Sequence, residues 1–154
     1  MKRGLVQLIA GGLYSGASPI VPGTTGSIPP WLIAWFLLAG NQAALGIVAV
    51  LTVFVSVWAA GEAERFYGHD AKKIVIDEWA GMFLTLLFVP YSLVNYLIGF
   101  AAFRAFDVVK IPPAAQAERL PRGWGVTMDD VVAGVQANIL TQIVVRLIAR
   151  SAGA

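Results

Sequence analysis

The sequence predicts an all-α protein, a multi-helix membrane-embedded bundle with short, partly broken helices and polar loops on the cytoplasmic side. Hydrophobic residues make up 58% of the 154 positions and charged residues 13%, which is about half the charge of an ordinary soluble domain. Asp, Glu, Lys and Arg are absent from residues 4–61 and from residues 79–103. The length suits a single domain spanning residues 1–154.

The first apolar segment, residues 5–13, follows Lys2 and Arg3. With the small residues at positions 15–17 it has the pattern of a secretory signal. The run is short and contains Gln7 and a pair of glycines. An uncleaved first helix or a membrane-surface segment is therefore favoured.

Four further apolar stretches predict helices. Residues 28–39 and 43–60 are separated by Gly-Asn-Gln, a turn signal, and predict a helical hairpin. Residues 79–103 are interrupted by Pro-Tyr-Ser and predict two short helices. The last stretch is residues 131–145. Several of these pieces are shorter than the roughly 20 residues that a bilayer crossing needs, so some are expected to be half-inserted or packed inside the bundle.

The charged residues predict the orientation of this bundle. If both apolar blocks cross the bilayer and return, the N terminus and residues 62–78 and 104–130 lie on one side. Nine of the eleven Lys and Arg residues then share that side, which is cytoplasmic by the positive-inside rule. Residues 73–76 have the composition of a short strand, but one strand makes no sheet, so no β-structure is expected.

Composition also limits the chemistry. The chain has no cysteine and its only histidine is His69, so a metal site must consist mainly of oxygen ligands, which favours Mg²⁺. Five of the nine carboxylates border apolar runs, and these are Asp77, Glu78, Asp107, Asp129 and Asp130. Glu118 is expected to be solvated outside any site. The roles of Glu62, Glu64, His69 and Asp70 stay open.

Residues 21–27 form a Gly- and Thr-rich stretch before the first predicted hairpin. Its hydroxyl and backbone N–H groups suit a phosphate, and the candidates are Thr24, Thr25, Gly26 and Ser27. An ordinary turn, with Ser27 capping a helix that begins near Pro29, explains the same pattern.

Asp77 and Glu78 are adjacent carboxylates at the predicted start of a helix. They either stabilise the positive end of the helix dipole or belong to a site. Gly81 follows one turn later and costs helix stability of about 1 kcal/mol relative to Ala. A small residue there leaves room for a ligand or for another backbone.

Arg104, Asp107 and Lys110 recur at intervals of three and share one helical face. They either form surface ion pairs or combine a cation ligand, Asp107, with two phosphate-binding cations. Residues 127–130 form a plausible capping box for the last helix.

The last predicted helix carries a polar stripe at i,i+4 spacing, and its members are Asp130, Gly134, Asn138 and Gln142. At membrane depth, such a stripe usually faces an internal site.

Four patterns in this order resemble those of the phosphatidylglycerophosphatase A family. They are Pro-Gly-Thr-Thr-Gly-Ser at residues 22–27, Ile-Val-Ile-Asp-Glu-Trp-Ala-Gly-Met at 74–82, Phe-Arg-Ala-Phe-Asp-Val-Val-Lys at 103–110, and Gly-Trp-Gly-Val-Thr-Met-Asp-Asp-Val-Val-Ala-Gly at 123–134 with Ala-Asn at 137–138. The resemblance covers about residues 12–138. The chain departs from the family after Lys110, where Ile-Pro-Pro replaces the usual Pro-x-Pro.

The resemblance implies a Mg²⁺-dependent phosphatase of the bacterial cytoplasmic membrane that hydrolyses phosphatidylglycerophosphate to phosphatidylglycerol and phosphate. Metal ligands would be Asp77, Glu78, Asp107, Asp129 and Asp130; Arg104 and Lys110 would hold the phosphoryl group with residues 24–27. Asp77, Glu78, Asp107, Arg104 and Lys110 are the predicted catalytic set.

Partners are the phospholipid substrate and the membrane, with no nucleic acid. The attacking group stays open between water, with Glu78 as base, and a carboxylate. A non-enzymatic small transporter or ion-binding assembly factor is the alternative. The sequence signature of CDP-alcohol phosphotransferases is absent.

Overall fold

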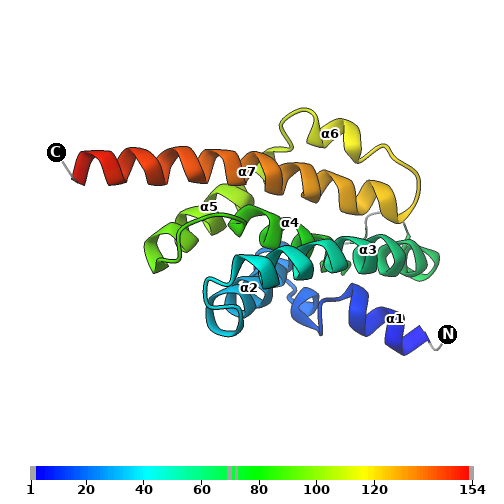
Figure 1. Cartoon of the computed structure of the whole chain (residues 1–154). Helices are drawn as coiled ribbons and strands as arrows, with labels where there is room; N and C mark the ends of the chain where they lie inside the picture. Colours follow the sequence, from blue (N-terminus) through cyan, green and yellow to red (C-terminus); the bar gives the residue numbers. More distant parts are fainter. Residues whose placement is uncertain (1–2, 69–70, 72, 153–154) are drawn as a thin grey trace.

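The computed structural model describes residues 3–68, 71 and 73–152. Every regular element in these ranges is helical, which confirms the predicted all-α class and leaves residues 73–76 without a strand there. The elements are α1 (Arg3–Ala10), the 3₁₀ turn η1 (Ser15–Ala17), α2 (Pro22–Leu32), the π turn η2 (Ile33–Leu37), α3 (Gln42–Tyr67), α4 (Ile76–Leu86), α5 (Leu93–Val109), α6 (Ala114–Ala117) and α7 (Gly123–Ala152). Figure 1 shows their arrangement.

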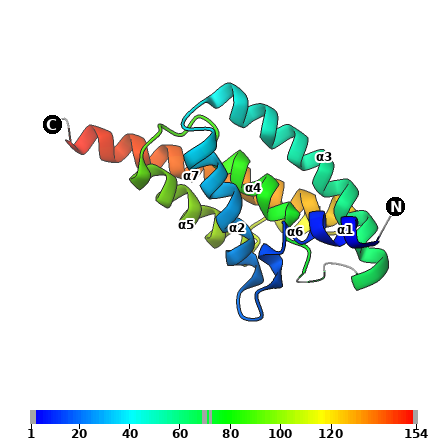
Figure 2. The same ribbon diagram turned by 90° about the horizontal axis from the view of Figure 1, so that it is seen from below.

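The first predicted hairpin is confirmed as α2 and α3, with η2 continuing α2 (Figure 2). The expected start near Pro29 is wrong, because α2 begins at Pro22 and residues 22–27 are helical. Pro22 suits a first helical position, where its missing N–H is not needed. Pro29 and Pro30 lie inside the helix, and the π turn follows them, as expected where prolines remove backbone donors.

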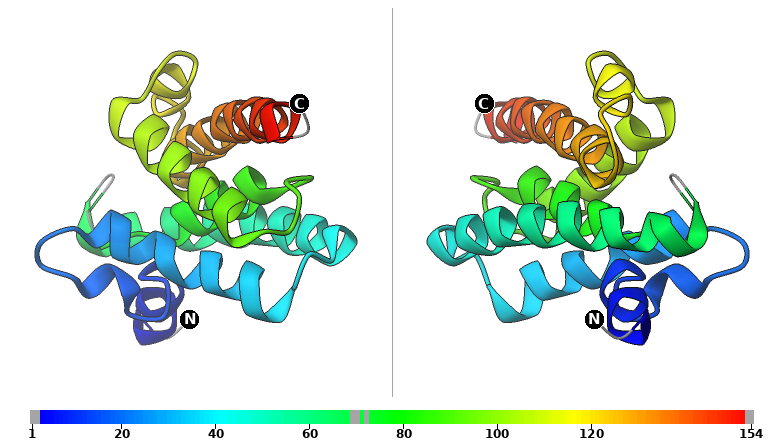
Figure 3. Two further views of the ribbon diagram at one scale, coloured as in Figure 1. Left: turned by 90° about the vertical axis from the view of Figure 1, so that its left-hand side faces the viewer. Right: turned by 90° about the vertical axis from the view of Figure 1, so that its right-hand side faces the viewer.

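The second apolar block forms α4 and α5, separated at residues 87–92 as predicted. Although α4 is only 11 residues long, it is the central helix, and nine of its residues are buried. It packs against α2, α3, α5 and α7, with α7 on one side of it and α2 on the other in Figure 3. Asp77 and Glu78 are therefore carried into the interior by the first turn of the most enclosed helix.

Most of the charged segments lie toward one end of the molecule, whereas Arg146 and Arg150 lie near the other end, in the last turns of α7. In Figure 1 the start of α1, the end of α3, α6 and the start of α7 lie toward the right, and the C terminus of α7 lies at the left. Two helices, α3 and α7, are long and apolar enough to cross a membrane by length and composition. On α1, Val6 and Ala10 are buried in a cluster with alanines of α3.

The last helix begins at Gly123, four residues before the predicted capping box. That box is wrong: Thr127 lies inside α7 and is fully buried, and its hydroxyl oxygen is 2.8 Å from that of Ser56 in α3. A β-carbon on Gly123 would lie 2.5 Å from the Gly61 nitrogen, so the two helices touch backbone to backbone. The glycine allows the close crossing.

Of the polar stripe on α7, only Asp130 lines the cavity described below, and the residues that follow it make structural contacts. Asn138 donates hydrogen bonds from Nδ2 to the carbonyl oxygens of Thr85, at 2.9 Å, and Leu87, at 2.6 Å. Gln142 in turn donates to Asn138 Oδ1 at 2.8 Å. Because α4 ends inside the bundle, its last carbonyls need donors, and α7 supplies them. This part of the stripe is structural.

Candidate active site

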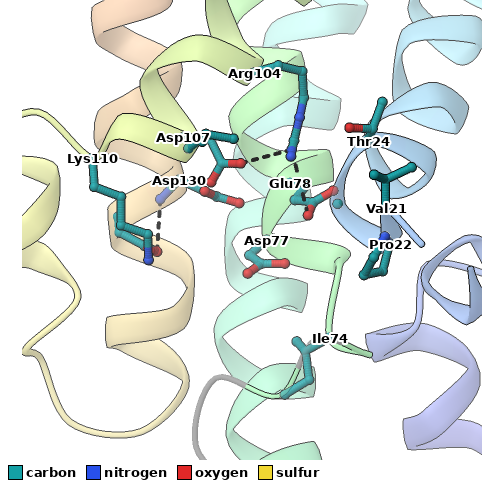
Figure 4. A pocket seen from close by; sticks show the side chains of 13 residues that line it. Val21, Pro22, Thr24, Ile74, Asp77, Glu78, Arg104, Asp107, Lys110 and Asp130 are labelled. Atoms are coloured by element: carbon teal, nitrogen blue, oxygen red, sulfur yellow. Dashed lines mark hydrogen bonds and ion pairs between the residues drawn. The ribbon is translucent and has the colours of Figure 1, made fainter. Parts of the chain in front are cut away.

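A partly open cavity of about 440 Å³, here called the polar cavity, lies between α2, α4, α5 and α7 (Figure 4). It brings together residues that are more than a hundred positions apart in the sequence. Its lining consists of Val21, Pro22, Gly23, Thr24, Ile74, Asp77, Glu78, Arg104, Asp107, Val108, Lys110, Asp129 and Asp130. All five predicted metal-binding carboxylates and both predicted phosphate-binding cations are among them.

A close crossing of α4 and α7 brings the carboxylates of these two helices together. A β-carbon added to Gly81 would lie 2.7 Å from the carbonyl oxygen of Asp130, and one added to Gly134 would lie 2.5 Å from that of Gly81. The room that Gly81 provides is thus taken up by the backbone of α7 and by the aromatic ring of Phe103 in α5. The approach of the two backbones sets Asp77 and Glu78 across from Asp130.

Arg104 connects three helices at the cavity wall. Its Nη1 atom is 2.9 Å from Asp107 Oδ2 and 3.8 Å from Glu78 Oε1. It also donates a hydrogen bond of 3.2 Å to Ser27 Oγ. One guanidinium therefore fixes side chains of α2, α4 and α5, and its planar shape suits several oxygen acceptors.

Lys110 ends α5 in a left-handed conformation, with φ of 49°. Its Nζ atom lies 2.8 Å from Asp129 Oδ2 and 3.0 Å from Glu118 Oε1. Burial acts to lower the pKa of the ammonium group, but the hydrogen bonds with Asp129 and Glu118 outweigh it and raise the pKa. Glu118, expected to be solvated outside any site, is partly exposed and does not line the cavity, but the turn of α6 brings its carboxylate to Lys110.

The remaining carboxylates crowd one another. Asp107 and Asp130 lie side by side in Figure 4, with Asp77 and Glu78 facing them. Burial, reinforced by the charge of Asp77, raises the pKa of Glu78 to about 10, although Arg104 acts against this rise. Five carboxyl groups therefore share the cavity with two cations, and the raised pKa of Glu78 shows that this crowding favours its protonated form.

An oxygen-rich, electronegative cavity suits a hard divalent cation. As the side chains stand, no three acidic or histidine groups in the described ranges are gathered into a ready metal-binding geometry. The oxygen ligands that line the cavity are of the type that Mg²⁺ takes.

The N terminus of α2 forms one rim of the cavity, and of residues 24–27 only Thr24 lines it. Thr25 Oγ1 donates to backbone carbonyls, including that of Ser15 at 2.9 Å. Ser27 is fully buried and donates to Glu78 Oε2 at 3.2 Å, and a β-carbon on Gly26 would lie 2.5 Å from the same oxygen. Thr25, Gly26 and Ser27 therefore do not line the cavity but position the helix start and the Glu78 side chain that do.

Gly23 was missed by the sequence reasoning. A β-carbon there would lie 2.7 Å from both Arg104 Nη2 and Glu78 Oε1. The sequence shows only a glycine after a proline, and its importance depends on side chains from α4 and α5. Of the undecided residues, Glu62 pairs with Arg65 at 3.0 Å on the surface, and His69 and Asp70 lie outside the described residues.

Comparisons with known proteins agree with these features. A family profile described as phosphatidylglycerophosphatase A matches residues 8–145. A Bacteroides thetaiotaomicron protein with the provisional name phosphatidylinositol-3-phosphatase is 39% identical over 153 residues, covering 93% of this chain and 96% of that protein. Phosphatidylglycerophosphatase A of Escherichia coli is 37% identical, covering 84% and 77%. The Haemophilus influenzae protein of the same name is 32% identical, covering 88% and 85%. No solved protein structure matches the chain significantly.

Proposed function

This chain belongs to the phosphatidylglycerophosphatase A family and is a phosphoric monoester hydrolase, and we propose that it hydrolyses phosphatidylglycerophosphate with Mg²⁺ as its cofactor. The substrate is a membrane lipid with a terminal phosphomonoester, and the products are phosphatidylglycerol and inorganic phosphate. Family membership disfavours the alternative of a non-enzymatic transporter or assembly factor. The observation that carries the proposal is the convergence of Asp77, Arg104, Asp107 and Asp130 on one cavity.

In this proposal the two cations bind the phosphoryl group. Arg104 offers a planar pair of donors and Lys110 a point charge, both at the cavity wall. Gly23 and Thr24, in the first turn of α2, line the same space, and N–H groups at a helix start would add donors to phosphate oxygens. Ser27 acts indirectly, because its hydroxyl contacts both Arg104 and Glu78.

The carboxylates would hold the metal. Asp77, Glu78, Asp107 and Asp130 have the oxygen chemistry that Mg²⁺ prefers. Asp129, which pairs with Lys110 at 2.8 Å, is a further candidate ligand. Bound Mg²⁺ would polarise the phosphoryl oxygens and offset the negative charge of the cavity. Without such a cation, the carboxylates would repel an incoming phosphate dianion.

Hydrolysis requires two proton transfers. A water oxygen bonds to phosphorus while the bond from phosphorus to the lipid oxygen breaks, and the leaving oxygen takes up a proton. Glu78 is the proposed acceptor of the water proton, since it lies in the cavity beside Arg104. Its raised pKa means that it must first lose its own proton, which the positive charge of a bound Mg²⁺ would favour. Attack by a carboxylate such as Asp107 is the competing route, and it would leave phosphate bound to the protein.

The proposed location is the bacterial inner membrane, with the cavity on the cytoplasmic side. The two long apolar helices, α3 and α7, supply the membrane contact. The polar cavity lies near the end of the molecule where the charged segments gather, and Lys and Arg in such segments favour the cytoplasmic face.

A second candidate substrate is a phosphatidylinositol 3-phosphate, which the 39% identical Bacteroides relative brings into consideration by its name. It also is a glycerophospholipid with a phosphomonoester on a polar alcohol. The same cations and carboxylates would act on its phosphate. The two lipids differ in the bulk of the alcohol that the cavity must accept.

Phosphate release from both lipids by the purified chain in detergent, with Mg²⁺ and after treatment with EDTA, tests the proposal. Release from phosphatidylglycerophosphate should stop with EDTA and return with added Mg²⁺. Faster release from the inositol lipid would replace the proposed substrate, and release that survives EDTA would refute the metal requirement. Radioactive phosphate retained on the quenched protein would identify a carboxylate nucleophile.

A further inference from the structure

An apolar groove of about 320 Å³ runs between α2 and α5, next to the polar cavity. It is here called the α2–α5 groove, and its lining is Thr24, Ile28, Trp31, Leu32, Leu97 and Phe100. Thr24 is the one residue that lines both spaces. A molecule with a polar end in the cavity could therefore continue directly into apolar surroundings.

We propose that the α2–α5 groove holds the first part of an acyl chain of the lipid whose phosphomonoester occupies the polar cavity. The inference rests on the proposed function, and it names the part of the protein that recognises the substrate as a lipid. Five of the six lining side chains are large and apolar, so they offer a hydrocarbon chain contact without a polar partner. The cationic side chains of the neighbouring polar cavity attract the phosphate end of the lipid, so the acyl chain is the part that reaches the groove.

The groove has one rigid wall and an open side. Trp31 donates a hydrogen bond of 2.9 Å from its indole N–H to the carbonyl oxygen of Tyr96, and its ring stacks on Trp35 with centroids 6.1 Å apart. In contrast, Ile28 is 42% exposed and Leu97 is 51% exposed. A chain could enter sideways from surrounding lipid and rest against a fixed tryptophan.

The spacing along α2 suits a lipid. Ile28 is one helical turn beyond Thr24, which places it about 6 Å further along the axis. A lipid with its phosphate at Thr24 would bring the glycerol backbone and the start of a chain over this turn. The volume of the groove accommodates part of one chain and not a whole lipid.

The expected effect of the groove is on orientation more than on affinity. A chain that leaves a bilayer or micelle for the groove exchanges one apolar environment for another, so it gains little free energy of transfer. Contact with a rigid wall instead limits the positions of the phosphate at the other end. Correct positioning of reacting groups has a large effect on rate.

The test compares two substrates and two variants of the purified full chain in detergent. The substrates are dioleoyl phosphatidylglycerophosphate and its deacylated, water-soluble counterpart. Leu97→Trp fills the groove, and Leu147→Trp is the control, since Leu147 is similarly exposed on α7 and lines none of the cavities described here. Leu97→Trp should lower kcat/KM for the acylated lipid roughly tenfold, with little change for the deacylated substrate.

Equal losses on both substrates, or no loss on either, would overturn the groove assignment and leave the proposed function intact. Phosphate release from neither substrate by the wild type would refute the proposed function and this inference with it. Leu147→Trp should match the wild type on both substrates, and a selective loss in that variant would also overturn the assignment.

Photolabelling supplies a measurement that does not depend on turnover. The probe is phosphatidic acid with a diazirine near the start of one acyl chain. Labelling of α2 and α5 should be displaced by phosphatidic acid but not by phosphatidylcholine, and it should fall in Leu97→Trp. Labelling spread evenly over α3 and α7, with no displacement, would overturn the inference.

Discussion

Gly134 in α7 lies directly against the backbone of Gly81 in α4, where a β-carbon on Gly134 would come within 2.5 Å of the Gly81 carbonyl oxygen. The Thr85 hydroxyl spans the same contact, because it donates to the Gly81 oxygen at 2.8 Å and to the Gly134 oxygen at 3.3 Å. This crossing sets the separation between the carboxylates of α4 and Asp130.

Gly134→Ala should therefore damage both stability and activity. The added methyl group meets backbone, which cannot rotate away, and such overpacking costs about 1–3 kcal/mol. Gly46→Ala is the matched control, since a β-carbon there would meet only Leu87 Cδ2 at 3.8 Å. Thermal unfolding in detergent and phosphate release measure the two effects. Wild-type behaviour of Gly134→Ala would contradict the described contact.

Asp107→Asn should abolish turnover while the protein still folds. The change keeps the size of the side chain but removes a negative charge next to Arg104 and the proposed cation, and a loss of at least roughly 100-fold is expected. Asp77→Asn and Asp130→Asn should behave alike. Glu62→Gln is the control, because Glu62 pairs only with Arg65 at the surface in the described contacts. A comparable loss in Glu62→Gln would refute this assignment of roles.

Arg104→Lys should lower kcat/KM by about tenfold to 100-fold in the phosphate-release assay. A single ammonium cannot reproduce the contacts that Nη1 and its planar group make with Ser27, Glu78 and Asp107. Added guanidinium should partly restore the activity of Arg104→Ala. Full activity of the lysine variant would argue against a role for the guanidinium shape.

Glu78 should make stability depend on pH in the absence of divalent cations. Its pKa is raised from 4.5 to about 10 in the folded chain. Below 4.5 both states hold the proton; above it the unfolded chain releases the proton while the folded chain keeps it, so stability is lost as pH rises toward 10.

The midpoint of thermal unfolding in EDTA should thus fall between about pH 5 and pH 9, and Glu78→Gln should show a smaller fall. Other carboxylates in the cavity contribute to the slope, so the difference between wild type and variant is the informative quantity. Identical slopes would show that Glu78 does not carry a raised pKa.

The helices and most of the site could be predicted because they depend on local patterns. Uncharged runs bounded by turns identify α2 to α5 and α7, and residues such as Asp107 stand out by their rarity in an apolar chain. The convergence of these carboxylates was a hypothesis from the sequence, and the described cavity agrees with it.

Features that depend on two distant segments could not be predicted. The sequence suggests that Thr127 caps the last helix, but in the structure Thr127 lies inside that helix. Its hydroxyl instead hydrogen-bonds with that of Ser56, which is 71 positions earlier in the chain. Similarly, the polar stripe of the last helix suggests that Asn138 faces a site. Its actual hydrogen-bond partners are backbone carbonyl oxygens, which cannot be recognised in a sequence. Glu118 returns to Lys110 through the short turn of α6, which no periodic pattern marks.

The bond from Asn138 to the end of α4 also bears on the order in which the chain matures. The two carbonyls that it serves are made more than fifty residues earlier during synthesis. Until α7 emerges, they must remain hydrated, because an amide oxygen kept from water without a donor is costly. The nascent central helix is thus expected to stay open to solvent until α7 has emerged, and a ribosome-stalled fragment ending before α7 should be sensitive to protease at residues 85–87.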